Sequence, residues 1–229
     1  MCGLFCIDEY ETRGWTNVCQ VIYLLIGMKS ETSAPLGRPR AFDPDAALER
    51  AMHVFWAKGY EGAALSDLTR AMRINRPSLY AAFGNKEQLF RKVLDRYMNG
   101  PLAFFQKALA ARKARDVIEQ IFLGAANMPS DPRTPAGCLV VQGALACGDA
   151  VGSVRKEIAA RRAAAKVALR RRLQRANREG DLPPNADPAE LSRYVMTVLH
   201  GMAVQGADGA NQHQLRRVAD IALRAWPKR

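Results

Sequence analysis

The chain has 229 residues and a formal net charge of +12, with 48% hydrophobic and 24% charged residues. This composition excludes an intrinsically disordered chain, and the length allows one or two domains with a sizeable core. The positive charge favours a polyanionic partner. However, residues 152–179 alone hold ten lysines and arginines against two glutamates, so the net charge does not show where such a partner binds.

Residues 1–41 precede the first strong helical pattern. Residues 1–28 lack the basic start of a secretory signal, and the apolar run Val18–Met28 is shorter than the roughly 20 residues that cross a bilayer. We interpret residues 1–28 as an extension outside the functional chain, and the alternative is a short native segment, docked or disordered. The following residues form a polar arm that contains Arg38 and Arg40. No membrane partner is expected.

The first predicted helix begins after residue 43. Asp43 supplies a capping carboxylate, and Pro44 suits the first helical turn. Apolar residues then recur at helical spacing until Lys58 and Gly59 end the element. A second, short helix is expected over residues 65–72.

Two further helix starts follow closely. Asn75 can cap a third helix, which Gly84 ends. Asn85 and Gln88 have the spacing of a capping box and predict a fourth helix over residues 85–98.

The remaining sequence is helical in pattern and shows no alternating strand with hairpin turns. The predicted fold class is therefore all-α. The expected helices lie near residues 101–112, 115–127, 136–148, 152–179, 187–207 and 211–226.

The second and third helices are separated only by Arg73–Asn75, which is the spacing of a helix-turn-helix. In this motif the second helix enters the DNA major groove with its N-terminal residues at the base edges. Here these residues are Asn75, Arg76, Pro77 and Ser78. Arg76 can bind guanine or a phosphate, Ser78 can hydrogen-bond to either, and Pro77 can contact a thymine methyl group. In the alternative interpretation, Asn75 is only a cap and Arg76 only part of a solvated face.

Residues 42–97 resemble the TetR family of one-component transcriptional repressors. The resemblance extends over more than fifty residues and is far more specific than a helix-turn-helix alone. The matching positions are Phe55, Gly59-Tyr60, Leu65-x-Asp67-Leu68, Leu79-Tyr80-x-x-Phe83 and Gly84-x-Lys86-Glu87-x-Leu89-Phe90.

The resemblance implies a three-helix helix-turn-helix DNA-binding domain at residues 42–90 and a helical effector-binding and dimerisation domain at residues 91–229. It implies a homodimeric repressor that binds a pseudo-palindromic double-stranded DNA operator and is released by a small-molecule effector. Two recognition helices would then lie about one DNA turn apart, roughly 34–36 Å. The helix at residues 85–98 would act as the lever between the two domains.

Individual DNA contacts also follow from the resemblance. Tyr80 and Lys86 would each meet a phosphate, and the N-terminal residues of the recognition helix would face the groove. Arg38 and Arg40 of the arm would lie against the DNA backbone or in the minor groove.

Two features depart from the family pattern. Ala63 and Ala64 stand where the family often has a hydroxyl cap for the second helix, and the loss of such a cap costs about 1 kcal/mol. Arg73 stands where the tight turn often carries glycine, so it is expected at a positive φ. The sequence therefore does not fix the residue at which the second helix starts.

An effector pocket is expected among the helices of residues 101–148, although each candidate residue alone also fits an ordinary core. The candidates are Phe104, Phe105, Ile121, Phe122, Met128, Cys138 and Val141.

By the same resemblance, the two long helices at residues 152–179 and 187–207 pair with their copies in a two-fold four-helix bundle. The basic residues of the first of them are interpreted as a solvated face over a packed seam. The candidate interface residues are Leu169, Leu173, Leu191, Tyr194, Val195, Val198, Leu199 and Met202.

The five cysteines are odd in number and lack CxxC spacing, which predicts a reducing compartment. We expect the protein in the cytoplasm, and on the nucleoid when it is bound to DNA. A redox- or metal-responsive regulator using Cys138 or Cys147 is an alternative. The two cysteines would lie on nearly opposite faces of one helix, so they would not share a metal or a disulfide. A small helical enzyme is a further alternative, but the three histidines lie on separate elements and no catalytic or cofactor motif is present. No cofactor and no metal are expected.

Overall fold

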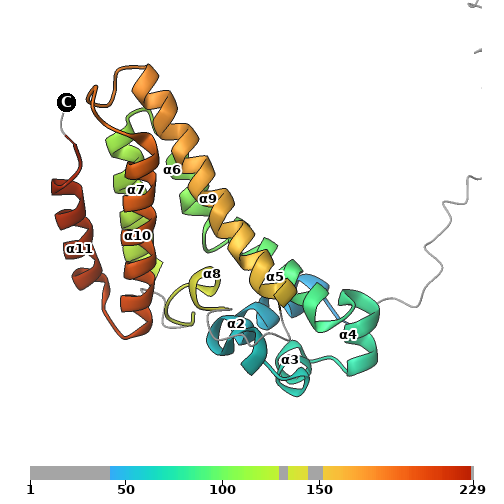
Figure 1. The fold of residues 1–229 in the computed structure, drawn as a ribbon. Helices are drawn as coiled ribbons and strands as arrows, with labels where there is room; N and C mark the ends of the chain where they lie inside the picture. Colours follow the sequence, from blue (N-terminus) through green and yellow to red (C-terminus); the bar gives the residue numbers. More distant parts are fainter. Residues whose placement is uncertain (1–41, 129–133, 144–151, 228–229) are drawn as a thin grey trace, which may run out of the picture. The chain divides into compact units, whose positions relative to one another are not determined.

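The computed structural model describes residues 42–128, 134–143 and 152–227, which form ten helices and no strand (Figure 1). The predicted all-α class is confirmed. None of the described helices is long and apolar enough to cross a membrane. The helices are α2 (Pro44–Gly62), α3 (Leu65–Met72), α4 (Arg76–Phe83), α5 (Lys86–Asn99), α6 (Ala103–Leu109), α7 (Ala114–Asn127), α8 (Leu139–Gln142), α9 (Gly152–Arg178), α10 (Pro188–Ala207) and α11 (Gln212–Arg224).

Capping side chains fix the starts of α2, α4 and α5 where the sequence predicts them. The carboxylate of Asp43 accepts a hydrogen bond from a backbone N–H in the first turn of α2. Asn75 Oδ1 accepts from the Ser78 N–H at 2.8 Å. Asn85 and Gln88 form the reciprocal capping box at the start of α5. These contacts satisfy backbone donors that have no partner within the helix.

The helix α3 begins without a side-chain cap at Ala64, as the sequence predicts. Its buried residues Leu68 and Met72 pack in the core that it shares with α2. The exposed ion pair between Lys58 Nζ and Asp67 Oδ2 at 2.7 Å also links the two helices, and this hydrogen bond lowers the pKa of Asp67. The helix α2 runs past its predicted end to Gly62, with a kink at Gly59, whose φ is 67°. Tyr60, which follows the kink, is thereby turned into the core.

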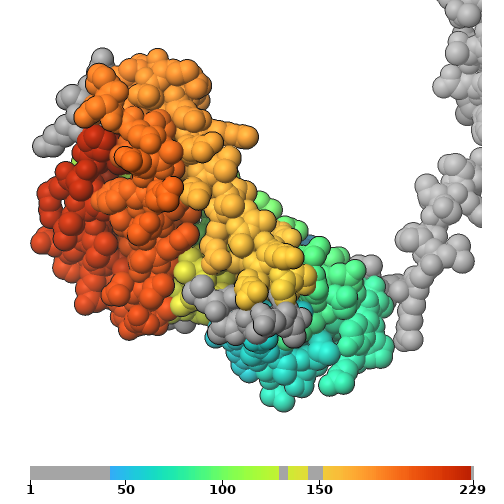
Figure 2. Space-filling model, in the orientation of Figure 1, coloured from blue at the N-terminus to red at the C-terminus, as the bar shows by residue number. Residues whose placement is uncertain are grey.

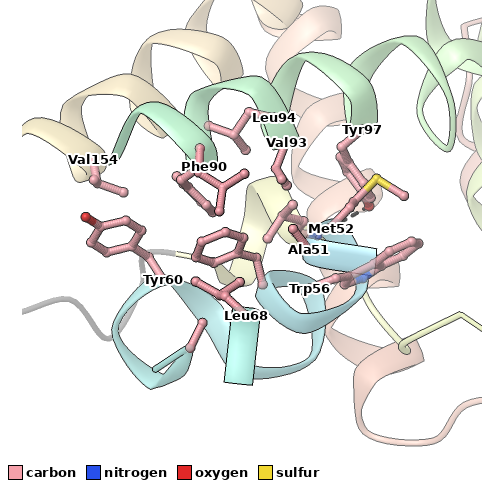
Figure 3. Packing of buried hydrophobic residues seen from close by; sticks show 14 of the residues in the cluster. Ala51, Met52, Trp56, Tyr60, Leu68, Phe90, Val93, Leu94, Tyr97 and Val154 are labelled. Carbon is pink, nitrogen blue, oxygen red and sulfur yellow. Dashed lines mark hydrogen bonds between the residues drawn. The ribbon is translucent and has the colours of Figure 1, made fainter. Parts of the chain in front are cut away.

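A cluster of aromatic side chains joins α2 to α5. The Phe90 ring lies edge-on to Phe55 and Tyr60, with centroid distances of 4.9 and 5.1 Å. Figure 3 shows Phe90, Val93 and Tyr97 of α5 pointing toward α2. The core of the helix-turn-helix therefore continues along α5 as far as Tyr97, which is fully buried.

The C-terminal helices form a second core. The helix α11 packs against α7, and α10 packs against both α7 and α9 (Figure 1). Arg172 is buried in this region and donates hydrogen bonds to the carbonyls of Ala111 and Arg112 at 2.8 and 2.9 Å. The fully buried side chains of this core include Val117, Ile118, Ile121, Phe122, Leu169, Leu173 and Val195.

The helix predicted over residues 136–148 needs correction. Its described part is helical only over Leu139–Gln142, and residues 144–148 lie outside the described residues. Gly137 has a φ of 80° and Cys138 is extended, which stops a helix from starting earlier. A Cβ at position 137 would also lie 2.9 Å from Cβ of Ala207, so this turn needs glycine for space as well as for conformation.

We expect Phe90→Ala to lower the free energy of unfolding by about 3–5 kcal/mol, because it removes a buried ring and leaves a cavity between α2 and α5. Gln174→Ala on the exposed face of α9 is the matched control and should change it by less than about 0.5 kcal/mol. Urea unfolding followed by circular dichroism at one protein concentration compares the two. A loss below about 1 kcal/mol for Phe90→Ala would contradict this packing.

Candidate nucleic-acid interface and effector pocket

The turn between α3 and α4 is tight and well bonded. Arg73 takes the left-handed conformation with φ 58°, which confirms the positive φ predicted for it. Its N–H donates to the carbonyl of Arg70 at 3.2 Å, and the Ile74 N–H donates to Thr69 at 3.1 Å. This geometry closes the C-terminus of α3 in the way that glycine usually does.

The beginning of α4 exposes the residues that the sequence assigns to DNA. Asn75, Arg76 and Pro77 are exposed, and Ser78, whose backbone N–H donates to the Asn75 cap, is half-buried. Tyr80, on the same helix, is 47% exposed. The opposite side of α4 is fixed by buried Leu79 and Phe83. A rigid helix therefore presents its N-terminal turn outward.

Lys86 is the first residue of α5, close to this surface in the chain. Its ammonium group lies 4.6 Å from the ring centroid of Tyr60, which holds the side chain near the start of the helix. The N-termini of α4 and α5 both carry backbone donors and a favourable dipole for an anion such as a phosphate. Arg38 and Arg40, the predicted arm contacts, lie outside the described residues.

A second feature is an apolar pocket bounded by α5, α6, α7, α8, α9 and α10. It contains about 770 Å³ of unoccupied space, part of which is open to solvent. Five of the seven predicted pocket residues line it, namely Phe104, Phe105, Met128, Cys138 and Val141. The other two, Ile121 and Phe122, do not line it, because they are fully buried in the second core. Pocket and core residues share the same helical period, so periodicity does not separate them.

The short helix α8 connects the pocket wall to the helix-turn-helix. Its segment lines the pocket with Cys138, Val140 and Val141. On the other side, the indole N–H of Trp56 donates to the Gly137 carbonyl at 3.2 Å. The backbone at the end of the segment is bonded too, because the Tyr60 N–H donates to Gly143 at 3.2 Å.

The helix α5 completes this connection. The Leu139 N–H donates to the Tyr97 hydroxyl at 3.3 Å, and the Tyr97 ring stands edge-on to Trp56 at 4.8 Å. Asp95 of α5 is bridged to Arg161 of α9 at 2.8 Å. The pocket and the helix-turn-helix thus share one bonded framework.

The comparisons with known proteins agree with this geometry. The model of the bacterial regulatory proteins of the tetR family matches residues 47–93, and that of the tetracyclin repressor-like C-terminal domain matches residues 113–221. The chain is 34% identical over 194 residues to the HTH-type transcriptional repressor ComR of Escherichia coli. The match covers 84% of this chain and 92% of ComR. The chain belongs to the TetR family. It is a transcriptional regulator of this family, not an enzyme.

Solved structures of the family also match this regulator. A cysteine mutant of the TetR family transcriptional regulator CifR, complexed with 26-bp double-strand operator DNA, is 42% identical with a TM-score of 0.79. The match covers 83% of this chain and all of that chain. A putative TetR transcriptional regulator from Rhodococcus sp. RHA1 is 36% identical with a TM-score of 0.56, over 81% of this chain and all of that one.

The predicted dimer residues divide into two groups in this structure. Leu169, Leu173, Val195 and Met202 are at most 2% exposed and pack inside the regulator's own chain, so they have no surface to offer a second copy. This corrects the prediction for these four residues. The remaining four, Leu191, Tyr194, Val198 and Leu199, are half-buried.

Sequence reasoning missed several residues that shape the pocket of this regulator. Arg161, Arg162 and His200 line it, yet the sequence places both arginines in a run interpreted as a solvated face. His200 could have been predicted from the sequence, because an ionisable residue interrupts a mainly apolar stretch of its helix. Burial, then the charge of Arg162, lowers its pKa.

Cys138 is 7% exposed and contacts the Tyr97 hydroxyl. Burial raises the pKa of this thiol, and the hydrogen bond from Tyr97 offsets part of the effect. Cys147 lies outside the described residues, among which no cluster of three or more metal-ligating side chains occurs. The structure therefore gives the cysteine-based alternative no support at Cys138.

In a variant that keeps Cys138 and replaces the other four cysteines with serine, we expect alkylation by iodoacetamide at pH 8 to be at least about tenfold slower than in urea. A raised pKa leaves less thiolate at this pH, and burial blocks the reagent. Mass spectrometry of timed samples gives the rate. Alkylation as fast in the folded as in the unfolded protein would instead favour the redox-responsive alternative.

Proposed function

We propose that this protein is a homodimeric repressor that binds a pseudo-palindromic operator and leaves it when a small molecule fills the apolar pocket. The observation that carries this proposal is the exposed N-terminal turn of α4 on a rigidly capped helix-turn-helix. The likeness to the CifR complex with operator DNA supports the mode of binding. We place the protein in the cytoplasm, on the nucleoid when it is bound to DNA.

In the proposed complex, the first turn of α4 reads the bases. Arg76 donates to guanine or a phosphate, Pro77 contacts a thymine methyl group, and the Ser78 hydroxyl bonds to either a base or the backbone. Asn75 uses Oδ1 for its cap, which leaves the two amide N–H donors for a phosphate. Arg38 and Arg40 of the arm would add cations at the backbone or in the minor groove.

Tyr80 and Lys86 position the protein on the phosphates without reading sequence. The Tyr80 hydroxyl offers a neutral donor, and Lys86 offers a charge at the N-terminus of α5. The two contacts are therefore distinguishable by their dependence on salt, because only a cationic contact releases counterions from DNA.

A dimer through α10 and α11 fits the exposed side chains better than the predicted pairing of α9 with α10. Large apolar side chains that remain exposed in one chain are Val204 on α10 and Val218 and Ile221 on α11, at 39%, 41% and 58%. The outer faces of α10 and α11 lie side by side on the surface in Figure 2. Gly201 of α10 has open space at its Cβ position, which allows close approach of a second copy. We infer that these two helices and their copies form a four-helix bundle.

Release follows if the effector favours an arrangement of the two recognition helices that does not match the operator. The helix α5 is the proposed lever, and the α8 segment is bonded to both α2 and α5. A ligand shifts this equilibrium only as far as its affinity differs between the two arrangements. The direct test is selection of bound sequences from random DNA. The proposal fails if no sequence is enriched, and a palindromic consensus supports the dimer.

We expect Tyr80→Phe to weaken operator binding roughly tenfold at every salt concentration, because it removes one hydrogen bond to a charged phosphate. Lys86→Gln should instead reduce the slope of log K against log salt by about one unit. Fluorescence anisotropy with labelled operator measures both. Lys107→Gln, an exposed lysine of α6, is the charge-matched control and should leave the slope unchanged. Equal slopes for the Lys86 and Lys107 variants would show that Lys86 makes no contact with a phosphate.

We expect Ile221→Glu to raise the dimer dissociation constant at least about a hundredfold, because burying an unpaired carboxylate costs several kcal/mol. Light scattering during size-exclusion chromatography, over a range of protein concentrations, gives this constant. Gln174→Glu introduces the same charge on the exposed face of α9 and should leave the dimer intact. The reverse result would favour pairing through α9.

A further inference from the structure

The lining of the pocket is almost entirely apolar. Aromatic, methionine and aliphatic side chains form most of the wall, and the polar side chains of its lining are Gln106, Arg161, Arg162 and His200. Such a wall favours the apolar body of a ligand, and a few placed polar groups fix its orientation. The chemistry of these polar groups therefore decides which headgroup the ligand carries.

The two arginines in the wall are in different electrostatic situations. Arg161 is paired with two carboxylates, Asp95 and Glu157, each at 2.8 Å. Arg162 has no carboxylate partner in the described parts of the chain. Its charge is thus available to a ligand, whereas that of Arg161 is already neutralised.

The present partners of Arg162 are weak. One terminal nitrogen donates to the carbonyls of Val140 and Val141, both at the long distance of 3.4 Å. A guanidinium has five N–H donors arranged to match a carboxylate with two parallel hydrogen bonds. A half-buried cation beside an apolar wall, held only by long bonds to neutral carbonyls, gains from such a partner.

His200 limits the charge of the headgroup. Burial lowers its pKa, and the nearby charge of Arg162 lowers it further, so the neutral imidazole is favoured. It can donate or accept one hydrogen bond, but it adds no second positive charge to the pocket. Arg162 is therefore the one cation of the described lining that lacks a carboxylate partner, and a ligand with one negative charge would supply it.

We propose that the effector is an apolar molecule with a single carboxylate, which pairs with Arg162 while its body fills the pocket. The inference rests on the proposed function, in which this pocket holds the effector. It names the class of ligand, a fatty or aryl carboxylate, and the residue that selects it.

The position of Arg162 also gives this ligand a route to the DNA-binding helices. A carboxylate that takes the guanidinium withdraws it from the carbonyls of Val140 and Val141 in α8. The α8 segment ends at Gly143, which accepts the Tyr60 N–H of α2. The carbonyls that bind Arg162 and the carbonyl that binds α2 therefore belong to the same short segment, so binding of the headgroup would act on the contact with α2.

The test uses the full-length protein and a panel of probes, namely octanoate, decanoate, dodecanoate and 2-naphthoate, each paired with its neutral alcohol. Isothermal titration calorimetry below micellar concentrations gives each dissociation constant. We expect at least one carboxylate to bind about tenfold or more tightly than its alcohol, because the charged hydrogen bonds to Arg162 are absent for the alcohol. Equal affinities, or no binding by any member, overturn the proposal. Tighter binding of decyl phosphate than of decanoate overturns the choice of a single carboxylate.

Variants identify the residue. Arg162→Gln should abolish the preference for carboxylate over alcohol, and Arg162→Lys should keep part of it. Lys166→Gln, an exposed lysine one turn along α9, removes the same charge and should keep the full preference. Unchanged preference in a folded Arg162→Gln variant overturns the assignment, and the binding of the alcohols shows that its pocket is intact.

Operator binding in the absence of any probe separates this inference from the function on which it rests. If the protein binds an operator but shows no preference for carboxylates, the proposed ligand class is wrong and the proposed repressor function still holds. If no DNA sequence is bound, the repressor itself fails. Decanoate should also lower operator affinity in the wild type and not in Arg162→Gln.

Discussion

The buried hydrogen bond from the Trp56 indole to the Gly137 carbonyl joins segments 81 residues apart, and it ties the core of the helix-turn-helix to the segment that lines the pocket. Both groups are buried, so neither has water as an alternative partner. The bond fixes the turn before α8, whose glycine is the residue that the positive φ requires. With that turn in place, α8 presents one side to the core of the helix-turn-helix and the other to the pocket.

Local signals explain why the sequence predicts the helices and the turn of the helix-turn-helix correctly. Asn75 and Asn85 cap helices through contacts within three residues, and the positive φ of Arg73 belongs to a turn closed by its neighbours. The C-terminal half depends on distant contacts, and there the predictions were less accurate. The turn at Gly137 forms against Trp56 and Ala207, neither of which is near it in sequence. The apolar residues Leu169 and Val195 have the period expected of an interface, but they serve the core of the same chain.

The charge of α9 shows a further limit of sequence patterns. The sequence predicts one solvated basic face, yet three of its arginines make different contacts in the folded chain. Arg161 bridges to α5 and Arg172 is buried against the carbonyls that precede α7. Arg162 faces the pocket. Only the position of each side chain relative to its partners separates these roles, and a count of charges does not contain that information.

The helix α5 places the two proposed binding events at its opposite ends. Its 14 residues span about 20 Å, from Lys86 beside the proposed DNA-facing surface to Tyr97 and Asp95 beside α8 and α9. The capping box at Asn85 fixes its start, and the aromatic cluster around Phe90 holds its middle against α2. Because packed cores pass between discrete arrangements more readily than they deform, a shift at Tyr97 would be carried along α5 as a rigid displacement. In the proposed mechanism, the same packing that stabilises the recognition helix would make its position depend on the contents of the pocket.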